Sequence, residues 1–223
     1  MKINVMQDVL QANDKIAEDN RQIFRKNRNF VINLMSSPGA GKTLLLEKTA
    51  EMLAGKLRLG VIVGDVETTR DADRISKFGI PTIQLTTGNA CHLDANMVAH
   101  ALPHLKLDEI DILVVENVGN LVCPAEFIIG EDHKVMILSV TEGDEKPLKY
   151  PLMFHESKLM LINKIDLIQY TNFNLDEAKA NARKINPDID IIEISCINGT
   201  GLDRWISWLT DHYQLKQKGL SNA

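Results

Sequence analysis

The chain lacks what three large classes of protein require. Its three cysteines, Cys91, Cys123 and Cys196, are an odd number and too few for a disulfide framework, so we expect reduced thiols in a reducing compartment. Basic residues are not in excess, because 25 Lys and Arg stand against 30 Asp and Glu for a net charge of -5, which argues against nucleic acid as a partner. No apolar run approaches the ~20 residues of a transmembrane helix, and the N-terminal segment lacks the apolar stretch of a signal peptide. The sequence therefore predicts a soluble, cytoplasmic protein that binds neither nucleic acid nor membrane.

Short apolar runs, rich in β-branched residues, alternate along the chain with segments of helical periodicity. They lie at 30–35, 59–63, 82–85, 112–116, 135–140, 159–163 and 191–195. Near-continuous apolar strands between helices are typical of a parallel sheet that is covered on both faces. We therefore expect an α/β fold of the P-loop NTPase type, a doubly wound and mostly parallel β-sheet with helices on both faces. Since the sequence shows no repeat or low-complexity segment, residues 1–223 are expected to form a single domain.

The two ends of the chain lie outside this alternation. Apolar residues between 5 and 24 fall on one helical stripe with charged residues between them, which predicts an N-terminal amphipathic helix within 1–28. Such a stripe usually packs on its own domain, and membrane or partner binding is the alternative. The basic run 25–28 is interpreted as the cationic end of this helix, which the helix dipole favours. Residues 217–223 are expected to form a frayed tail.

The segment SSPGAGKT follows the first apolar run and precedes a helical run at 44–53. A strand, a glycine-rich turn that ends in Lys and Thr, and a helix are the context of a Walker A phosphate-binding loop. Gly39 and Gly41 let backbone N–H groups converge on the phosphates, and the helix N-terminus adds a positive dipole end. We expect Lys42 to reach the β and γ phosphates and the Thr43 hydroxyl to bind Mg²⁺.

One position departs from the usual phosphate-loop motif. Ser36 stands where the first glycine is expected, and a positive φ at this residue would cost roughly 1–2 kcal/mol. That cost is small beside a full set of phosphate contacts.

The segment NKID at 163–166 directly follows an apolar strand, which is where the NKxD motif of GTPases lies. Asp166 can accept two hydrogen bonds from the N1–H and 2-amino groups of guanine, neither of which adenine offers. Two charge-assisted bonds of roughly 1.5–3 kcal/mol each favour guanine over adenine by about 10²- to 10⁴-fold. Ser195 and Cys196, at the end of a later strand, are interpreted as the loop that completes the base pocket. The predicted nucleotide-binding residues are Ser37, Pro38, Gly39, Ala40, Gly41, Lys42, Thr43, Leu44, Asn163, Lys164, Asp166, Ser195 and Cys196.

Two acidic residues stand at strand ends where a nucleotide-bound magnesium ion needs carboxylates. Asp65 follows the run 59–63, and Glu116 ends the run 112–116 in a segment, ENVG, that resembles the DxxG switch with Glu in place of Asp. For Asp65, an ordinary helix cap is the alternative. We therefore expect Thr43, Asp65 and Glu116 to hold Mg²⁺, and these three with Lys42 to form the catalytic set.

The predicted switch segment lacks the glutamine with which many GTPases orient the attacking water. Asn120 holds that position, after Gly119. We therefore predict slow intrinsic GTP hydrolysis, in the range of roughly 10⁻⁴ to 10⁻² per second.

Two of the three cysteines stand near histidine or near the switch segment. Cys91 and His92 are adjacent, and Cys123 lies a few residues beyond Glu116. Thiolate and imidazole suit Zn²⁺, Ni²⁺ or Cu⁺. Three ligands are too few for a closed structural zinc site, so the site either stays open or is completed by a second copy of the chain. From spacing alone, packing thiols and a surface histidine are the alternative, and His100 and His104 are candidates for an additional ligand.

Taken together, four segments resemble the HypB family of GTPases, which incorporate nickel into hydrogenase. They are SSPGAGKT at 36–43, GDVETTRDADRI at 64–75, TGNACHLDANMV at 87–98 and ENVGNLVCPAEF at 116–127. The resemblance implies a dimerising P-loop GTPase that uses nucleotide binding to control nickel during maturation of nickel–iron hydrogenase. It also implies a homodimer, a HypA-type nickel chaperone and the precursor of the hydrogenase large subunit as partners.

The same resemblance assigns Cys91, His92 and Cys123 to the family's metal-binding positions, where nickel or zinc can sit near the dimer interface. The chain departs from some family members at its N-terminus, because no cysteine motif or histidine-rich stretch precedes Cys91. A high-affinity N-terminal nickel site is therefore not expected.

Two other functions are considered. A urease accessory GTPase shares the fold and the nickel task, but its metal motif has a proline between Cys and His, whereas Cys91 and His92 are contiguous. A GTP-dependent switch that binds no metal, with structural cysteines, is the second alternative.

Overall fold

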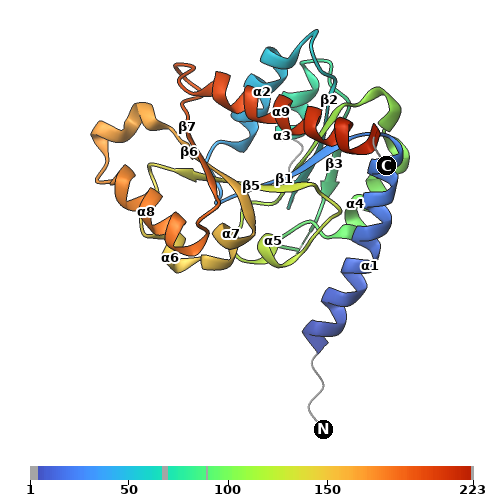
Figure 1. Ribbon diagram of the computed structural model, residues 1–223, viewed down its shortest axis with the longest axis horizontal. Helices are drawn as coiled ribbons and strands as arrows, with labels where there is room; N and C mark the ends of the chain where they lie inside the picture. Colours follow the sequence, from blue (N-terminus) through green and yellow to red (C-terminus); the bar gives the residue numbers. More distant parts are fainter. Residues whose placement is uncertain (1–4, 67–69, 89, 222–223) are drawn as a thin grey trace.

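The computed structural model describes residues 5–66, 70–88 and 90–221. All seven predicted apolar runs are strands of one parallel sheet, in the order β3-β2-β4-β1-β5-β6-β7 (Figure 1). The predicted P-loop NTPase α/β fold is confirmed. The strands are β1 (Phe30–Ser36), β2 (Leu59–Asp65), β3 (Thr82–Thr86), β4 (Ile112–Glu116), β5 (His133–Ser139), β6 (Ser157–Asn163) and β7 (Asp190–Glu193).

Helices connect the strands and cover the sheet. In the described ranges, no helix combines the length and the apolar character that crossing a bilayer would take. The α-helices are α1 (Val5–Lys26), α2 (Lys42–Leu53), α3 (Arg70–Ser76), α4 (Ala95–Ala101), α5 (Cys123–Glu126), α6 (Lys146–Lys149), α7 (Pro151–Glu156), α8 (Leu175–Ile185) and α9 (Leu202–Ser221). Short 3₁₀-helices are η1 (Leu102–His104), η2 (Leu107–Glu109) and η3 (Ile165–Tyr170).

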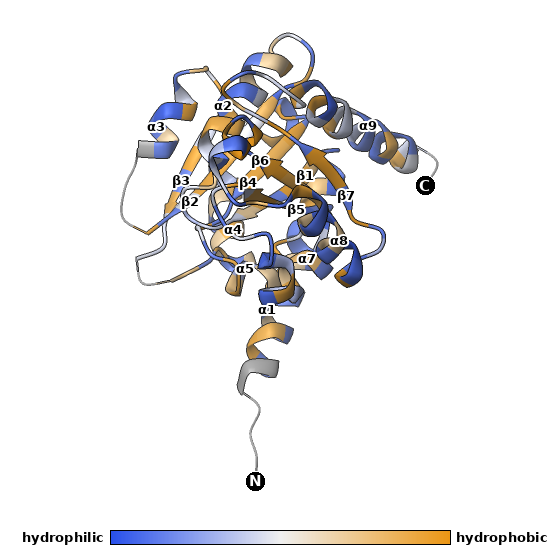
Figure 2. Cartoon of the chain, turned by 90° about the vertical axis from the view of Figure 1, so that its left-hand side faces the viewer, coloured by the Kyte–Doolittle hydropathy of each residue, from blue (hydrophilic) through white to orange (hydrophobic). Residues whose placement is uncertain are grey.

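The central strands bury both of their faces, because successive side chains point to opposite sides of the sheet, whereas the edge strands β3 and β7 are mostly half-buried. In β1, Ile32 and Leu34 pack with residues of α2 and α9, including the fully buried Trp205. Val31 faces the other side, where the buried Phe24 of α1 and residues of α4 cover the sheet. Figure 2 shows the resulting apolar strands in the interior, with helices around them. This two-sided burial explains why the strands are readable as continuous apolar runs.

Helix α1 forms where the apolar stripe predicts it, but its buried face is partly polar. Ala17 and Phe24 are fully buried as expected, whereas Ile23 is 40% exposed. Asn13 and Asn20 take buried positions on the same face as Ala17 and Phe24. They do so because the segments beneath α1 present backbone groups that need hydrogen-bond partners.

The C-terminal end differs from the frayed tail that the sequence predicts. Helix α9 continues to Ser221, and 222–223 lie outside the described residues. The Gln217 side-chain amide donates to the Arg28 carbonyl at 2.7 Å, and Arg28 Nε donates to Gln217 Oε1 at 2.9 Å. The turn after α1 therefore holds the last turns of α9 in helical form.

Candidate functional site

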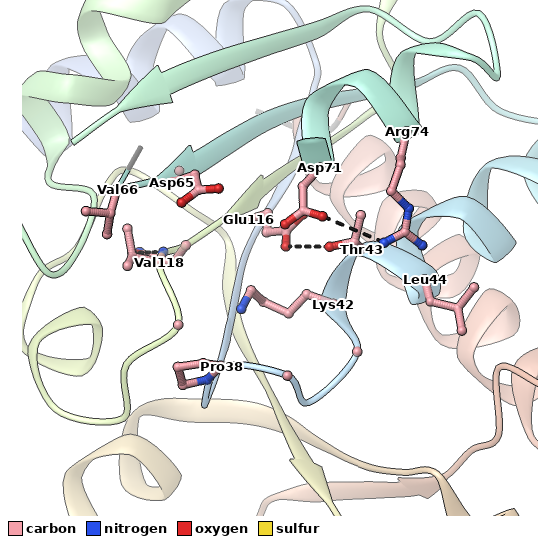
Figure 3. A pocket seen from close by; sticks show the side chains of 15 residues that line it. Pro38, Lys42, Thr43, Leu44, Asp65, Val66, Asp71, Arg74, Glu116 and Val118 are labelled. Atoms are coloured by element: carbon pink, nitrogen blue, oxygen red, sulfur yellow. Dashed lines mark hydrogen bonds and ion pairs between the residues drawn. The ribbon is translucent and has the colours of Figure 1, made fainter. Parts of the chain in front are cut away.

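The carboxyl ends of β1, β2 and β4 open into a cavity of about 470 Å³ (Figure 3). This edge is where ligands bind in doubly wound sheets. The cavity lining includes all four residues that the sequence assigns to catalysis, together with two that it does not. They are Lys42, Thr43, Asp65 and Glu116, and then Asp71 and Arg74.

The phosphate-loop segment between β1 and α2 depends on glycine at one position above all. Gly41 has a φ of 104°, and a Cβ added there would lie 2.6 Å from Asn163 Nδ2. Only glycine meets both conditions. The Asn163 amide donates to the Ala40 carbonyl at 2.8 Å, so the loop is fixed against the NKID segment.

Ser36 does not carry the strain that its place in the motif allows. It is the fully buried last residue of β1 and is therefore extended. Its hydroxyl accepts a hydrogen bond from Lys42 Nζ at 3.0 Å and donates to the Ser37 carbonyl at 2.6 Å. Ser36 thus positions the Lys42 ammonium, a role that the motif alone does not reveal.

The acidic side of the cavity has a carboxylate with unused hydrogen-bonding capacity. Burial raises the pKa of Glu116 to about 7, against the opposing effect of the nearby Lys42. Thr43 Oγ1 donates to Glu116 Oε1 at 3.3 Å, while the buried Oε2 has no hydrogen-bond partner among the described residues. Asp65 and Asp71 point into the same space (Figure 3). Hard oxygen ligands around such a space fit Mg²⁺.

Lys42 shares this environment. Burial lowers the pKa of its ammonium group, and the carboxylates of Glu116, Asp71 and Asp65 oppose the shift. A buried cation surrounded by carboxylates is a site prepared for a charged ligand.

Sequence reasoning missed Asp71 and Arg74. Both lie on α3, three residues apart on one helix face, with Arg74 Nη1 and Asp71 Oδ1 3.8 Å apart. Arg74 also pairs with Glu47 of α2 at 2.8 Å between Nε and Oε1. The sequence signal that could have identified these two residues is their i,i+3 spacing shortly after the end of β2.

The residues predicted to bind the base lie together at the ends of β6 and β7. Ser195 Oγ donates to Asp166 Oδ1 at 2.5 Å, which fixes the carboxylate. Lys164 adopts a φ of 63° and its Nζ donates to the Gly39 carbonyl at 2.7 Å. Cys196 is buried, and burial raises the pKa of its thiol to about 11, so it stays protonated and unreactive. The other predicted nucleotide-binding residues lie in the phosphate loop and at the start of α2. Ser37 bonds Glu142, and Pro38 and Leu44 line the cavity.

Cys91, His92 and Cys123 form a second cluster. Their ligand atoms all lie within 4.8 Å of one another, with 2.9 Å between the two Sγ atoms. In the described part of the chain this group has three members, and neither His100 nor His104 belongs to it. His100 and His104 are exposed on α4 and η1. Helix α4 begins after His92, so His92 and His100 do not lie on one face of a common helix. Sulfur and imidazole donors this close fit a soft or borderline transition metal.

Hydrogen bonds connect this metal cluster with the segment after β4 that lines the cavity. The Leu93 N–H donates to Asn117 Oδ1 at 2.8 Å, and Asn120 Nδ2 donates to the Cys91 carbonyl at 3.3 Å. Asn117 directly follows Glu116 and itself lines the cavity. These bonds join the segment after β4 to the backbone on both sides of His92.

The model of the CobW/HypB/UreG nucleotide-binding domain matches residues 30–193. The hydrogenase maturation factor HypB of Escherichia coli strain K12 is 54% identical over 202 residues, which cover 91% of this chain and 70% of that protein. The chain belongs to the HypB family. The resemblance seen in its motifs is confirmed, and its nucleotide-binding domain spans the cavity, the Cys/His cluster and the NKID segment.

Structures of HypB proteins agree with this assignment. The crystal structure of Helicobacter pylori HypB in complex with nickel matches with a TM-score of 0.88 at 38% identity, over 91% of this chain and 95% of that one. The protein of H. pylori strain J99, named a hydrogenase/urease maturation factor, is 38% identical over 213 residues that cover 94% of this chain and 87% of that protein. HypB family members thus share the whole fold described here.

Proposed function

We propose that this chain is a GTP-binding and GTP-hydrolysing metallochaperone that assists nickel insertion into nickel–iron hydrogenase. The observation that carries the proposal is the physical connection between two sites. Asn117 and Asn120, next to the phosphate-sensing Glu116, bond the backbone on either side of His92. Binding of a γ-phosphate can therefore change the geometry of the metal ligands.

In the nucleotide site, Thr43, Asp65 and Glu116 hold Mg²⁺, which neutralises charge on the β and γ phosphates. Lys42 contacts the same phosphates, and Asp166 selects guanine. Asn120 is engaged with the Cys91 carbonyl and does not take the place of a water-orienting glutamine. The intrinsic turnover is accordingly slow, roughly 10⁻⁴ to 10⁻² per second.

In the metal site, Cys91, His92 and Cys123 bind Ni²⁺ or Zn²⁺. Three ligands from one chain leave coordination open, so a homodimer completes it across a two-fold axis. A HypA-type chaperone and the precursor of the hydrogenase large subunit are the proposed partners in the cytoplasm. The nickel-bound HypB of H. pylori supports nickel as the cargo.

The test is isothermal titration with Ni²⁺ and Zn²⁺ in the presence of GDP or a non-hydrolysable GTP analogue. We expect metal affinity to differ between the two nucleotide states and to be lost in Cys91→Ala and Cys123→Ala. His104→Ala is the matched control, because this histidine is exposed and lies outside the cluster. Equal affinities in both nucleotide states would remove the coupling, since a ligand cannot shift an equilibrium whose states it binds equally. Absence of any metal binding would favour the GTP switch without metal.

A role in urease maturation is the second candidate, because the H. pylori relative is named for both tasks. Affinity capture with the purified chain distinguishes them. Recovery of hydrogenase maturation proteins supports the main proposal, and recovery of urease proteins alone supports the alternative.

A further inference from the structure

Helix α1 packs over the two segments that carry the metal ligands. The segment with Cys91 and His92 leads into α4, whose first residue is Ala95. The segment with Cys123 continues through Ile128 to β5. Figure 1 shows α1 beside α4 on this side of the sheet, with the first turns of α1 projecting beyond the body of the protein.

Asn13 joins these two segments. Its Oδ1 accepts from the Ala95 N–H at 2.9 Å, and its Nδ2 donates to the Ile128 carbonyl at 2.8 Å. The side chain is only 7% exposed. The bond to Ala95 is buried and the bond to Ile128 is partly buried, and losing a buried partner costs more than losing one at the surface.

Asn20 repeats the arrangement two turns further along α1. Its Nδ2 donates to the Ala95 carbonyl at 2.8 Å and to the Ile129 carbonyl at 3.1 Å, and the residue is 1% exposed. A spacing of seven residues puts both asparagines on one helix face. Together they bind both backbone polar groups of Ala95 and two consecutive carbonyls beyond Cys123.

The backbone of the second segment touches α1 directly. A Cβ added to Gly130 would lie 2.7 Å from the Ala17 carbonyl oxygen and 2.9 Å from Asn20 Cβ. A side chain at position 130 would not fit at this separation, so glycine permits the close approach across which the asparagine bonds form.

We propose that Asn13 and Asn20 are positioning residues for the metal cluster. They hold the Cys91–His92 segment and the Cys123 segment at the separation in which the three ligand atoms converge. Partners that hydrogen-bond metal ligands directly change metal affinity by about 10- to 100-fold when they are removed, and the asparagines act on the same ligands through the intervening backbone. The inference rests on the metal binding in the proposed function and adds α1 as the element that sets its strength.

The cavity for nucleotide is built from other elements, namely the loop between β1 and α2, the end of β2, α3 and the segment after β4. Loss of the asparagines should thus affect metal binding and spare nucleotide binding. A merely structural role would weaken both through general destabilisation.

The experiment compares Asn13→Ala, Asn20→Ala and the double variant with Asn29→Ala. Asn29 is a matched control, because it is fully buried and its amide also donates to two backbone carbonyls, those of Leu107 and Ile110. Ni²⁺ and Zn²⁺ affinities are measured by competition with a chelator. The Ni²⁺–thiolate charge-transfer absorption, the GTP affinity and the unfolding temperature are recorded for each variant.

We expect the double variant to lose about 10- to 100-fold in metal affinity, with a weaker charge-transfer band and GTP affinity unchanged within about twofold. Asn29→Ala should lower the unfolding temperature without changing metal affinity. If the double variant does not fold, the single variants give the same comparison, each with a smaller loss.

Wild-type metal affinity in the asparagine variants would overturn the inference and leave the proposed function intact. An equal loss of metal affinity in Asn29→Ala would also overturn it, because the effect would then be general destabilisation. Absence of metal binding in the wild-type chain itself would remove the proposed function and the inference with it.

Discussion

The Asp166 carboxylate depends on a neighbour for its orientation. It belongs to NKID, but it is held by the hydroxyl of Ser195, which lies 29 residues further along the chain. The pairing fixes the carboxylate whose oxygens are the proposed acceptors for guanine. We therefore propose that guanine selection depends on this residue.

Asp166→Ala should reduce GTP affinity by about 10²- to 10⁴-fold, because two charge-assisted bonds of roughly 1.5–3 kcal/mol each are lost. ATP affinity should stay unchanged. Competition of GTP and ATP against a fluorescent nucleotide measures both, with Asp188→Ala, an exposed carboxylate elsewhere, as control. Retained preference for GTP in Asp166→Ala would show that other groups select the base.

Residues in contiguous motifs could be predicted, and residues defined by folding could not. Lys42, Thr43 and Glu116 were found because a strand end and its following loop fix their place. Asp71 and Asn120 acquire their roles only when α3 and the segment after β4 meet other loops. No residue spacing in the sequence predicts those contacts.

Helix α9 meets the amino end of β5 in a cluster of rings. His133 starts β5, and its ring centroid lies 5.0 Å from that of His212 and 5.8 Å from that of Phe30. Burial, and then repulsion from His212, lowers the pKa of His133 to about 4. The neutral imidazole is thus the form that the packing accepts.

This shift predicts a dependence of stability on pH. The unfolded chain protonates His133 below about 6.5, whereas the folded chain does so only near 4. The unfolded state therefore binds more protons between these values, and the free energy of unfolding should fall as pH drops through this range. Urea unfolding at pH 7.5, 6 and 5 measures it.

His133→Phe should flatten that dependence, and His104→Phe, an exposed control, should keep it. Identical slopes in wild type and His133→Phe would assign the pH effect to other groups.

Strands were predictable where both of their faces are buried among apolar side chains. The strand runs were found, yet β5 and β6 each begin two residues before the predicted start, at His133 and Ser157. Lys134 and Ser157 there are buried and bonded, with Lys134 Nζ donating to the Ala125 carbonyl at 2.6 Å and Ser157 Oγ to the Met153 carbonyl at 2.7 Å. In α1 the periodicity gave the helix but hid the buried asparagines, since polar residues are normally read as exposed.

For the molecule as a whole, the three-ligand cluster supports the proposed homodimer. Cys91 is exposed, and His92 and Cys123 are half-buried, so a second copy can reach the metal. We expect Ni²⁺ with a GTP analogue to convert the chain to a dimer in sedimentation velocity experiments. Cys91→Ala should stay monomeric under these conditions, and His104→Ala, an exposed histidine outside the cluster, should dimerise. Dimerisation of Cys91→Ala to the same extent would separate assembly from metal.

The hydrogen bonds of α1 also bear on the order of events during translation. Asn20 and its partner Ile129 are 109 residues apart, and ribosomes add about 5–20 residues per second. The helix is therefore synthesised roughly 5–22 s before the last carbonyl that it binds. A nascent chain that has reached Cys123 already carries all three thiol and imidazole ligands. The Ile128 and Ile129 carbonyls, which α1 binds, are still missing at that point. Ile129 follows Cys123 by six residues, so it is added roughly 0.3–1.2 s after the last metal ligand. Metal bound within that interval would meet ligands that α1 does not yet hold, and metal capture at full affinity would follow it.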